Sequence, residues 1–135
     1  MNKSIIRELT FKLLYSLEVQ KDFQEENYQL FFDNNDVIEN NAKEEIKESI
    51  TNIVKNNEEI ESQISSYLKA DWKIERISKV NISLMKLAIY EMMYKKIPYK
   101  IVINEIVELA KKYGEETSAS FINGVLATVV KENNL

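Results

Sequence analysis

The sequence predicts an all-α fold in one domain that covers residues 1–135. Only two glycines and one proline occur in the chain, whereas a β-sandwich or barrel with many tight turns needs more turn residues. Good helix formers fill the space between these few helix breakers. A length of 135 residues with 44% hydrophobic side chains is sufficient for one ordinary hydrophobic core.

The first helix is predicted from the N-terminus to about Val19. Asn2 and Ser4 are both good N-caps for its start. Apolar residues then recur every three or four positions, which is the spacing of one helix face. This core stripe consists of Ile6, Leu9, Leu13 and Leu17.

Two further helices are predicted at residues 25–32 and 42–68, with a polar loop at residues 33–41 between them. The longer helix is acidic, and its apolar residues keep to one side. Those apolar residues are Ile46, Ile50, Ile53, Ile60, Ile64, Tyr67 and Leu68. Together with the first helix, these elements would form an N-terminal helical subdomain at residues 1–70.

Residues 71–135 are predicted to form a C-terminal helical subdomain. Asp71 could cap a short helix at residues 72–77, and Trp72 would anchor the core between the two halves. The segment 79–94 is apolar nearly all round. Such a helix must be covered on several sides, so we expect it at the centre of the second half.

The next helix should begin at Pro98, because a helix does not need the backbone N–H of its first residue. It should run to Tyr113 and end at Gly114 with a left-handed C-cap. These boundaries follow from the only proline and from one of the two glycines in the chain.

Thr117 or Ser118 would cap the last helix, which runs to about Lys131. Gly124 lies inside this helix, where glycine costs about 1 kcal/mol relative to alanine. We expect close approach of a neighbouring helix or of a bound ligand to offset that cost.

The composition argues against enzymatic function. The chain has no cysteine and no histidine, which excludes disulfides and thiolate metal sites and removes the commonest general base and metal ligand. No nucleotide-binding loop is present. The adjacent acids at 58–59 and 115–116 are typical of a solvated surface. We therefore expect no catalytic residue, no metal and no cofactor.

The chain is expected to lie in the cytoplasm and away from membranes. Its apolar runs are far shorter than a membrane span. Arg7 and Glu8 interrupt the apolar pattern near the N-terminus, which argues against a secretory signal.

The net charge of −4 is unevenly distributed. Residues 21–70 carry 5 basic and 12 acidic side chains, whereas residues 1–20 are net +1 and residues 71–135 are net +2. A polyanion would therefore have to contact the two ends of the chain, with the acidic segment facing away. An ordinary solvated surface would explain the same distribution.

Three segments carry a pattern with many fixed spacings, and the densest is residues 97–126, IPYKIVINEIVELAKKYGEETSASFINGVL. The N-terminal segment contributes Arg7, Glu8, Phe11, Leu14, Tyr15 and Glu18, and the central one contributes Trp72, Arg76, Ile77, Val80, Lys86, Leu87, Ala88, Tyr90 and Glu91. In this pattern the chain resembles the NusB family of bacterial transcription antitermination factors. The resemblance covers over half of the chain, in the right order.

This resemblance implies a fold of two packed helical bundles and an RNA-binding adaptor. Members of the family pair with the ribosomal protein NusE. The pair binds single-stranded boxA RNA in ribosomal RNA leader transcripts and, with other Nus factors, helps RNA polymerase resist termination. The family contains both monomers and dimers, so a homodimer remains open here.

Two other interpretations remain. Some RNA methyltransferases carry a NusB-like N-terminal domain, although the sequence ends at Leu135 without a catalytic domain. A helical adaptor that binds only protein would also fit the helical pattern.

Tyr15 is the candidate that the residues themselves support best. It lies on the first helix roughly opposite Ile6, so its ring could stack on an unpaired base. Lys3, Arg7 and Lys12 could contact phosphates or simply be solvated.

Other candidates come from the second half of the chain. Gly114 and Thr117 lie near the start of the last helix, where backbone N–H groups suit a phosphate. Phe121 matches a family position associated with RNA, although its spacing also fits a core residue, and Asn123 could bond a base. Lys86 could be a surface charge or the counterpart of a family arginine.

The resemblance also implies positions that face a protein partner, at Asn81 and Glu91. Two departures from the family pattern bear on binding. The N-terminus has only Lys3 and Arg7 where the family is rich in arginine, which predicts weaker RNA binding by the isolated chain. Asn81 replaces a residue that is often acidic in the family.

Overall fold

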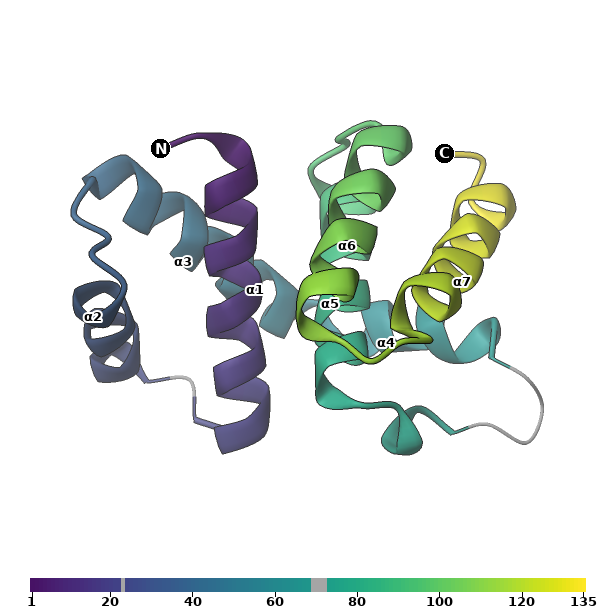
Figure 1. Cartoon of the computed structure of the whole chain (residues 1–135), viewed down its shortest axis with the longest axis horizontal. Helices are drawn as coiled ribbons and strands as arrows, with labels where there is room; N and C mark the ends of the chain where they lie inside the picture. The colour runs from purple at the N-terminus through teal and green to yellow at the C-terminus, as the bar shows by residue number, and fades with distance from the viewer. Residues whose placement is uncertain (23, 69–72) are drawn as a thin grey trace.

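The computed structural model describes residues 1–22, 24–68 and 73–135, and these residues form helices and no β-strand (Figure 1). The prediction of an all-α fold is therefore confirmed for the described residues. The elements are α1 (Lys3–Gln20), α2 (Glu25–Asn34), α3 (Asn40–Lys55), α4 (Asn57–Ser66), the 3-10 turn η1 (Ile74–Arg76), α5 (Lys79–Ile89), the π-helical turn η2 (Tyr90–Tyr94), α6 (Tyr99–Tyr113) and α7 (Ser118–Glu132).

The helices form two groups that meet along α1 and α5. Figure 1 shows α1, α2 and α3 on one side of the molecule and α5, α6 and α7 on the other. α4 packs against α5 and α7 as well as α3, and α1 packs against both α3 and α5. The division of the chain near residue 70 stays a prediction.

α5 is the central helix of the structure. Every residue from 82 to 90 is buried, and α5 contacts α1, α3, α4, α6 and α7. A helix that is apolar nearly all round requires such cover. The predicted central position of this segment is confirmed.

α1 begins as its sequence predicts. The side chain of Asn2 accepts a hydrogen bond from the backbone N–H of Ile5 at 2.8 Å, which satisfies one of the free donors at the helix start. The predicted core stripe is buried except for Ile6, which is half-buried. Phe11 and Leu14 are buried as well, so the buried face of α1 is wider than the stripe.

The prediction of one helix over residues 42–68 is wrong, because the helix is broken at Asn56. This residue has φ −105° and ψ 20°, and α4 starts at the following residue. The Nδ2 atom of Asn56 donates a hydrogen bond to the carbonyl oxygen of Asn52 at 2.8 Å. Asparagine side chains compete in this way with the helical hydrogen-bond pattern, and this favours a helix end.

The two glycines differ from expectation. Gly114 ends α6, but its φ of −93° and ψ of −169° are extended rather than left-handed. A Cβ atom there would lie 2.6 Å from the Oγ of Ser118 and 2.8 Å from the carbonyl oxygen of Ala110, so close packing requires this glycine. A Cβ at Gly124 would meet nothing within 4 Å. The expected approach of a neighbouring helix to Gly124 is therefore wrong, and approach by a bound ligand stays a prediction.

Two smaller points complete the comparison with the expected elements. Pro98 is the N-cap of α6 rather than its first helical residue, so the helix starts one residue later than predicted. The roles predicted for Asp71 and Trp72 lie outside the described residues. None of the helices in the described part of the chain is long and apolar enough to cross a membrane.

Candidate nucleic-acid interface

A groove of about 740 Å³ lies where η1, the start of α5 and the start of α7 meet. Figure 1 shows η1 and the turn between α6 and α7 at the same end of the molecule. The groove is lined by Lys73, Arg76, Ile77, Ser78, Asn81, Glu115, Thr117, Ser120 and Phe121. It therefore brings Asn81 together with two predicted site residues from a distant segment, Thr117 and Phe121.

Two helix N-termini border this groove. α5 starts directly after Ser78, whose Oγ accepts a hydrogen bond from the backbone N–H of Asn81 at 3.1 Å. α7 starts after Thr117, whose side chain makes no capping hydrogen bond. Helix N-termini carry partial positive charge and free N–H groups, which suit a phosphate. Both ends thus favour an anion in the same groove.

Lys73 and Arg76 add two full positive charges. Both are exposed, and neither forms an ion pair with any residue that the structure describes. Glu115 is the acid that lines the same groove. Sequence reasoning missed both cations as site residues, although Arg76 belonged to the pattern that carries the resemblance.

Asn81 and Phe121 supply groups that could contact a base. The Oδ1 atom of Asn81 is buried and has no hydrogen-bond partner among the described residues. A buried acceptor without a partner is costly, and a ligand N–H group would satisfy it. Phe121 is half-buried and lines the groove, where its ring can contact an unstacked base.

Tyr15 lies on α1, at one end of a row of aromatic side chains. Its side chain is exposed at 36%, so the prediction that it points away from the core is confirmed. Its ring centroid is 6.2 Å from that of Phe11, which is 5.2 Å from that of Tyr113. Tyr113 ends α6 directly before the turn to α7. The row therefore connects Tyr15 with the segment that leads to the groove.

Charged side chains fix α1 against α6 beside this row. The Nζ of Lys112 donates to Oε2 of Glu8 at 2.6 Å, and the hydroxyl of Tyr113 donates to the same oxygen. The hydrogen bond from Lys112 has the largest effect and that from Tyr113 the next, and together they hold the pKa of the Glu8 carboxyl below its ordinary value. Burial, together with the Glu8 carboxylate, raises the pKa of Tyr113.

Arg7 and Glu91 are not on an exposed binding surface, which corrects the expectations for both. Each side chain is only 7% exposed. The Nε and Nη2 atoms of Arg7 donate to Oε1 of Glu91 at 2.9 and 2.7 Å, and Nη1 lies 3.6 Å from Oε1 of Glu105. The guanidinium is thus occupied by carboxylates inside the protein, and we leave both residues out of the candidate surface.

Lys86 is likewise an interior residue, so its interpretation as a surface charge is wrong. Its side chain is 2% exposed, and its Nζ lies 2.8 Å from Glu18 and 2.9 Å from Glu61. The pair with α1 joins residues 68 positions apart. Helical spacing within one segment carries no information on such a contact.

The remaining predicted residues lie at other places. Lys3 is exposed and pairs with Glu45 at 2.5 Å. Lys12 is half-buried and donates to Asn35 at 3.3 Å, toward the α2–α3 connection. Asn123 lines a separate groove of about 450 Å³ between α6 and α7. Gly114 lies in the turn next to the main groove. The roles predicted for these four residues stay predictions.

The fold and the groove together define a class of protein. It is a helical binding protein with an open groove in which two cations, two helix N-termini and an aromatic ring face one space. Such a groove is suited to a polyanion with unstacked bases.

Comparison with known proteins names the family. The NusB family model matches residues 4–131. The chain is 46% identical over 132 residues to the transcription antitermination protein NusB of Acetivibrio thermocellus, which covers 97% of this chain and 90% of that protein. It is 40% identical to the NusB protein of Clostridium acetobutylicum, with 98% of each chain covered.

Solved structures of NusB proteins support the same family. T. maritima NusB has a TM-score of 0.86 and 33% identity, over 98% of this chain and 92% of that one. A NusB chain crystallised with NusE and double-stranded RNA has a TM-score of 0.85 and 27% identity, over 98% and 99% of the two chains. The chain belongs to the NusB family. It is accordingly a transcription antitermination protein, and the family is not one of enzymes.

Proposed function

We propose that this protein binds single-stranded, boxA-type RNA in ribosomal RNA leader transcripts through the groove between η1, α5 and α7, together with NusE. In this complex, with other Nus factors, it would support processive transcription by RNA polymerase, and it would act in the cytoplasm. The observation that carries the proposal is the convergence of two helix N-termini on a groove that also holds Lys73, Arg76 and Phe121.

The groove favours a single strand for a physical reason. Phosphates would lie at the helix N-termini and near the two cations, where the positive charge is concentrated. A base can then reach the Phe121 ring and the Oδ1 atom of Asn81 only if it is unstacked and unpaired. Tyr15, on the neighbouring helix, offers a second exposed ring for stacking.

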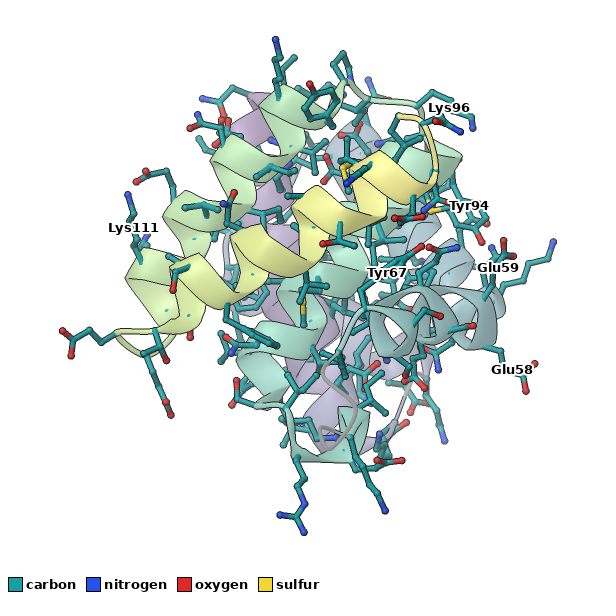
Figure 2. All side chains as sticks on the ribbon, turned by 90° about the vertical axis from the view of Figure 1, so that its right-hand side faces the viewer. Glu58, Glu59, Tyr67, Tyr94, Lys96 and Lys111 are labelled. Carbon is teal, nitrogen blue, oxygen red and sulfur yellow. The ribbon has the colours of Figure 1, made fainter. Side chains whose placement is uncertain are left out.

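Glu58 and Glu59, in the acidic part of the chain, do not line the groove. Figure 2 shows Glu58 and Glu59 projecting into solvent from α4, on the opposite side of the view from Lys111 near the end of α6. An RNA strand that stays in the groove would not contact these two acids, although α4 packs against η1 and the protein as a whole has a net charge of −4.

NusE would strengthen RNA binding by this chain. The support is the negative net charge and an N-terminus with few cations, of which Arg7 is occupied inside the protein. Only a few phosphate contacts are then left to the isolated chain, and affinity for RNA depends steeply on their number. A partner that contacts the same strand would supply the rest. A homodimer stays a prediction.

The test is the binding of labelled boxA RNA, measured by fluorescence anisotropy at fixed salt with and without NusE. We expect weak binding by the isolated chain and clearly tighter binding by the pair. Equal affinity with and without NusE would contradict the role of the partner. Binding of NusE with no RNA binding in either case would instead favour the helical adaptor that binds only protein.

A further inference from the structure

Two buried ion pairs cross the interface between α1 and the α5–η2 segment. Near the start of α1, Arg7 holds Glu91 through two nitrogens at 2.7 and 2.9 Å. Near its end, Glu18 accepts a hydrogen bond from Lys86 at 2.8 Å. Both pairs are nearly inaccessible to solvent.

The first pair has its positive charge on α1, whereas the second has its positive charge on α5. Along α1 the positive charge comes first and the negative charge second, and the same order holds along α5–η2, from Lys86 to Glu91. In the observed antiparallel register, each charge of α1 therefore lies against an opposite charge of the α5–η2 segment. A shift of α1 by one turn would displace its two charges by about 5.4 Å from their partners. Lys86 would keep Glu61 at 2.9 Å, but the buried Glu91 would lose the guanidinium of Arg7.

Stability alone gives little reason for these pairs. Removing two charges from water cancels much of their attraction, and apolar side chains of similar size often stabilise a fold equally well or better. Buried polar groups can instead fix the register of helices. Here the register decides where α1 places Tyr15, which lies between Arg7 and Glu18 in the sequence, relative to Asn81 in the groove.

We propose that Arg7–Glu91 and Glu18–Lys86 are positioning pairs for RNA binding, which hold α1 in the register that aligns Tyr15 with the groove. This inference rests on the proposed function for its RNA part. Its structural part, the register of α1, can be measured without RNA.

The main test replaces one pair by apolar side chains of similar volume, Arg7→Met with Glu91→Leu. The matched control is Lys47→Met with Glu25→Leu, an ion pair between α2 and α3 that is more exposed. The measurements are urea unfolding, the nuclear Overhauser contact between the Phe11 and Tyr113 rings, and the affinity for labelled boxA RNA in the presence of NusE.

We expect the Arg7/Glu91 variant to unfold at a urea concentration no lower than that of the parent. The nuclear Overhauser signal between the Phe11 and Tyr113 rings should be weaker, and RNA should bind roughly tenfold more weakly. The control should change neither the ring contact nor the affinity. An unchanged ring contact and an affinity within twofold of the parent would overturn the inference. If the parent itself binds no RNA, the proposed function fails, and the ring contact alone still decides whether the pair sets the register.

Arg7→Lys provides a second test, in case the double variant does not fold. Lysine keeps the charge but cannot contact Glu91 through a fork of two nitrogens. We expect a folded protein with a weakened ring contact and reduced RNA affinity. Full retention of both in this variant would contradict the positioning role of the bidentate pair.

Discussion

The two glycines illustrate how single positions carry different constraints. We predict that Gly114→Ala destabilises the protein by about 1–3 kcal/mol, because its Cβ would overlap Ser118 and the Ala110 carbonyl. Gly124→Ala should stabilise it by about 0.5–1 kcal/mol, since the position is helical and open. Urea unfolding of both variants measures these changes, and the same sign for both would contradict the packing account.

Gly124 lies on the same face of α7 as Ser120 and Phe121, one turn further along. An RNA strand that follows this face would therefore meet the added methyl group. A stabilised Gly124→Ala variant that binds RNA more weakly would support close approach by RNA as the reason for this glycine. Unchanged RNA affinity would remove that reason.

Tyr15→Ala tests base stacking at a single side chain. We expect RNA affinity to fall by about 1–3 kcal/mol with little change in salt dependence, because stacking on a ring involves no phosphate. Val19→Ala is the matched control, since Val19 is an exposed apolar residue one turn further along α1. Salt titrations of both variants give the measurement. Parent-like affinity for Tyr15→Ala would exclude Tyr15 from the RNA surface.

At the scale of elements, the contact between α1 and α6 should respond to pH. The pKa of Glu8 is lowered in the folded state by Lys112 and Tyr113. A lowered carboxyl pKa stabilises the fold above the unfolded pKa of about 4.3, and this stability is lost as pH falls through the folded value. We predict that, as pH falls from about 5 to 3, the free energy of unfolding decreases less for Glu8→Gln than for the parent.

Urea unfolding over this pH range is the measurement for Glu8. Glu44→Gln serves as the control, because Glu44 is exposed on α3 and forms no ion pair within the described part of the chain. The control should follow the parent. A Glu8→Gln profile parallel to that of the parent would show that this contact does not couple α1 to α6.

The helices were largely predictable because each follows from local information. Asn2 marked the start of α1, apolar residues all round placed α5 at the centre, and Gly114 marked the end of α6. The break at Asn56 was not predictable from periodicity, because the apolar residues of α3 and α4 continue on one side across it. There the hydrogen bond of an asparagine side chain overrides the hydrophobic pattern.

The site was only partly predictable, because it depends on contacts between distant segments. Thr117 was found through its place at the start of the last helix and Phe121 through the family pattern, and the structure adds Lys73 and Arg76 beside them. Arg7 and Lys86 were assigned to the surface because charged side chains usually lie there. Their buried partners, Glu91 and Glu18, are 84 and 68 residues away in the sequence.

At the scale of the whole molecule, the groove reconciles an acidic protein with a polyanionic ligand. Lys73, Arg76 and two helix N-termini gather at one end of the molecule, while acidic side chains are concentrated in residues 21–70. Local rather than net charge would then govern contact with RNA, and raised salt should weaken binding by screening that local field.

The most direct test of this account is a salt titration of boxA RNA binding by the NusE-bound protein, comparing the parent with Lys73→Gln combined with Arg76→Gln. We predict weaker binding and a log–log salt slope reduced by up to about 0.7 for each lost phosphate contact. Circular dichroism should show an unchanged fold, since both side chains are exposed and unpaired among the described residues. Parent-like affinity and slope in this variant would contradict the assignment of the groove as the RNA site.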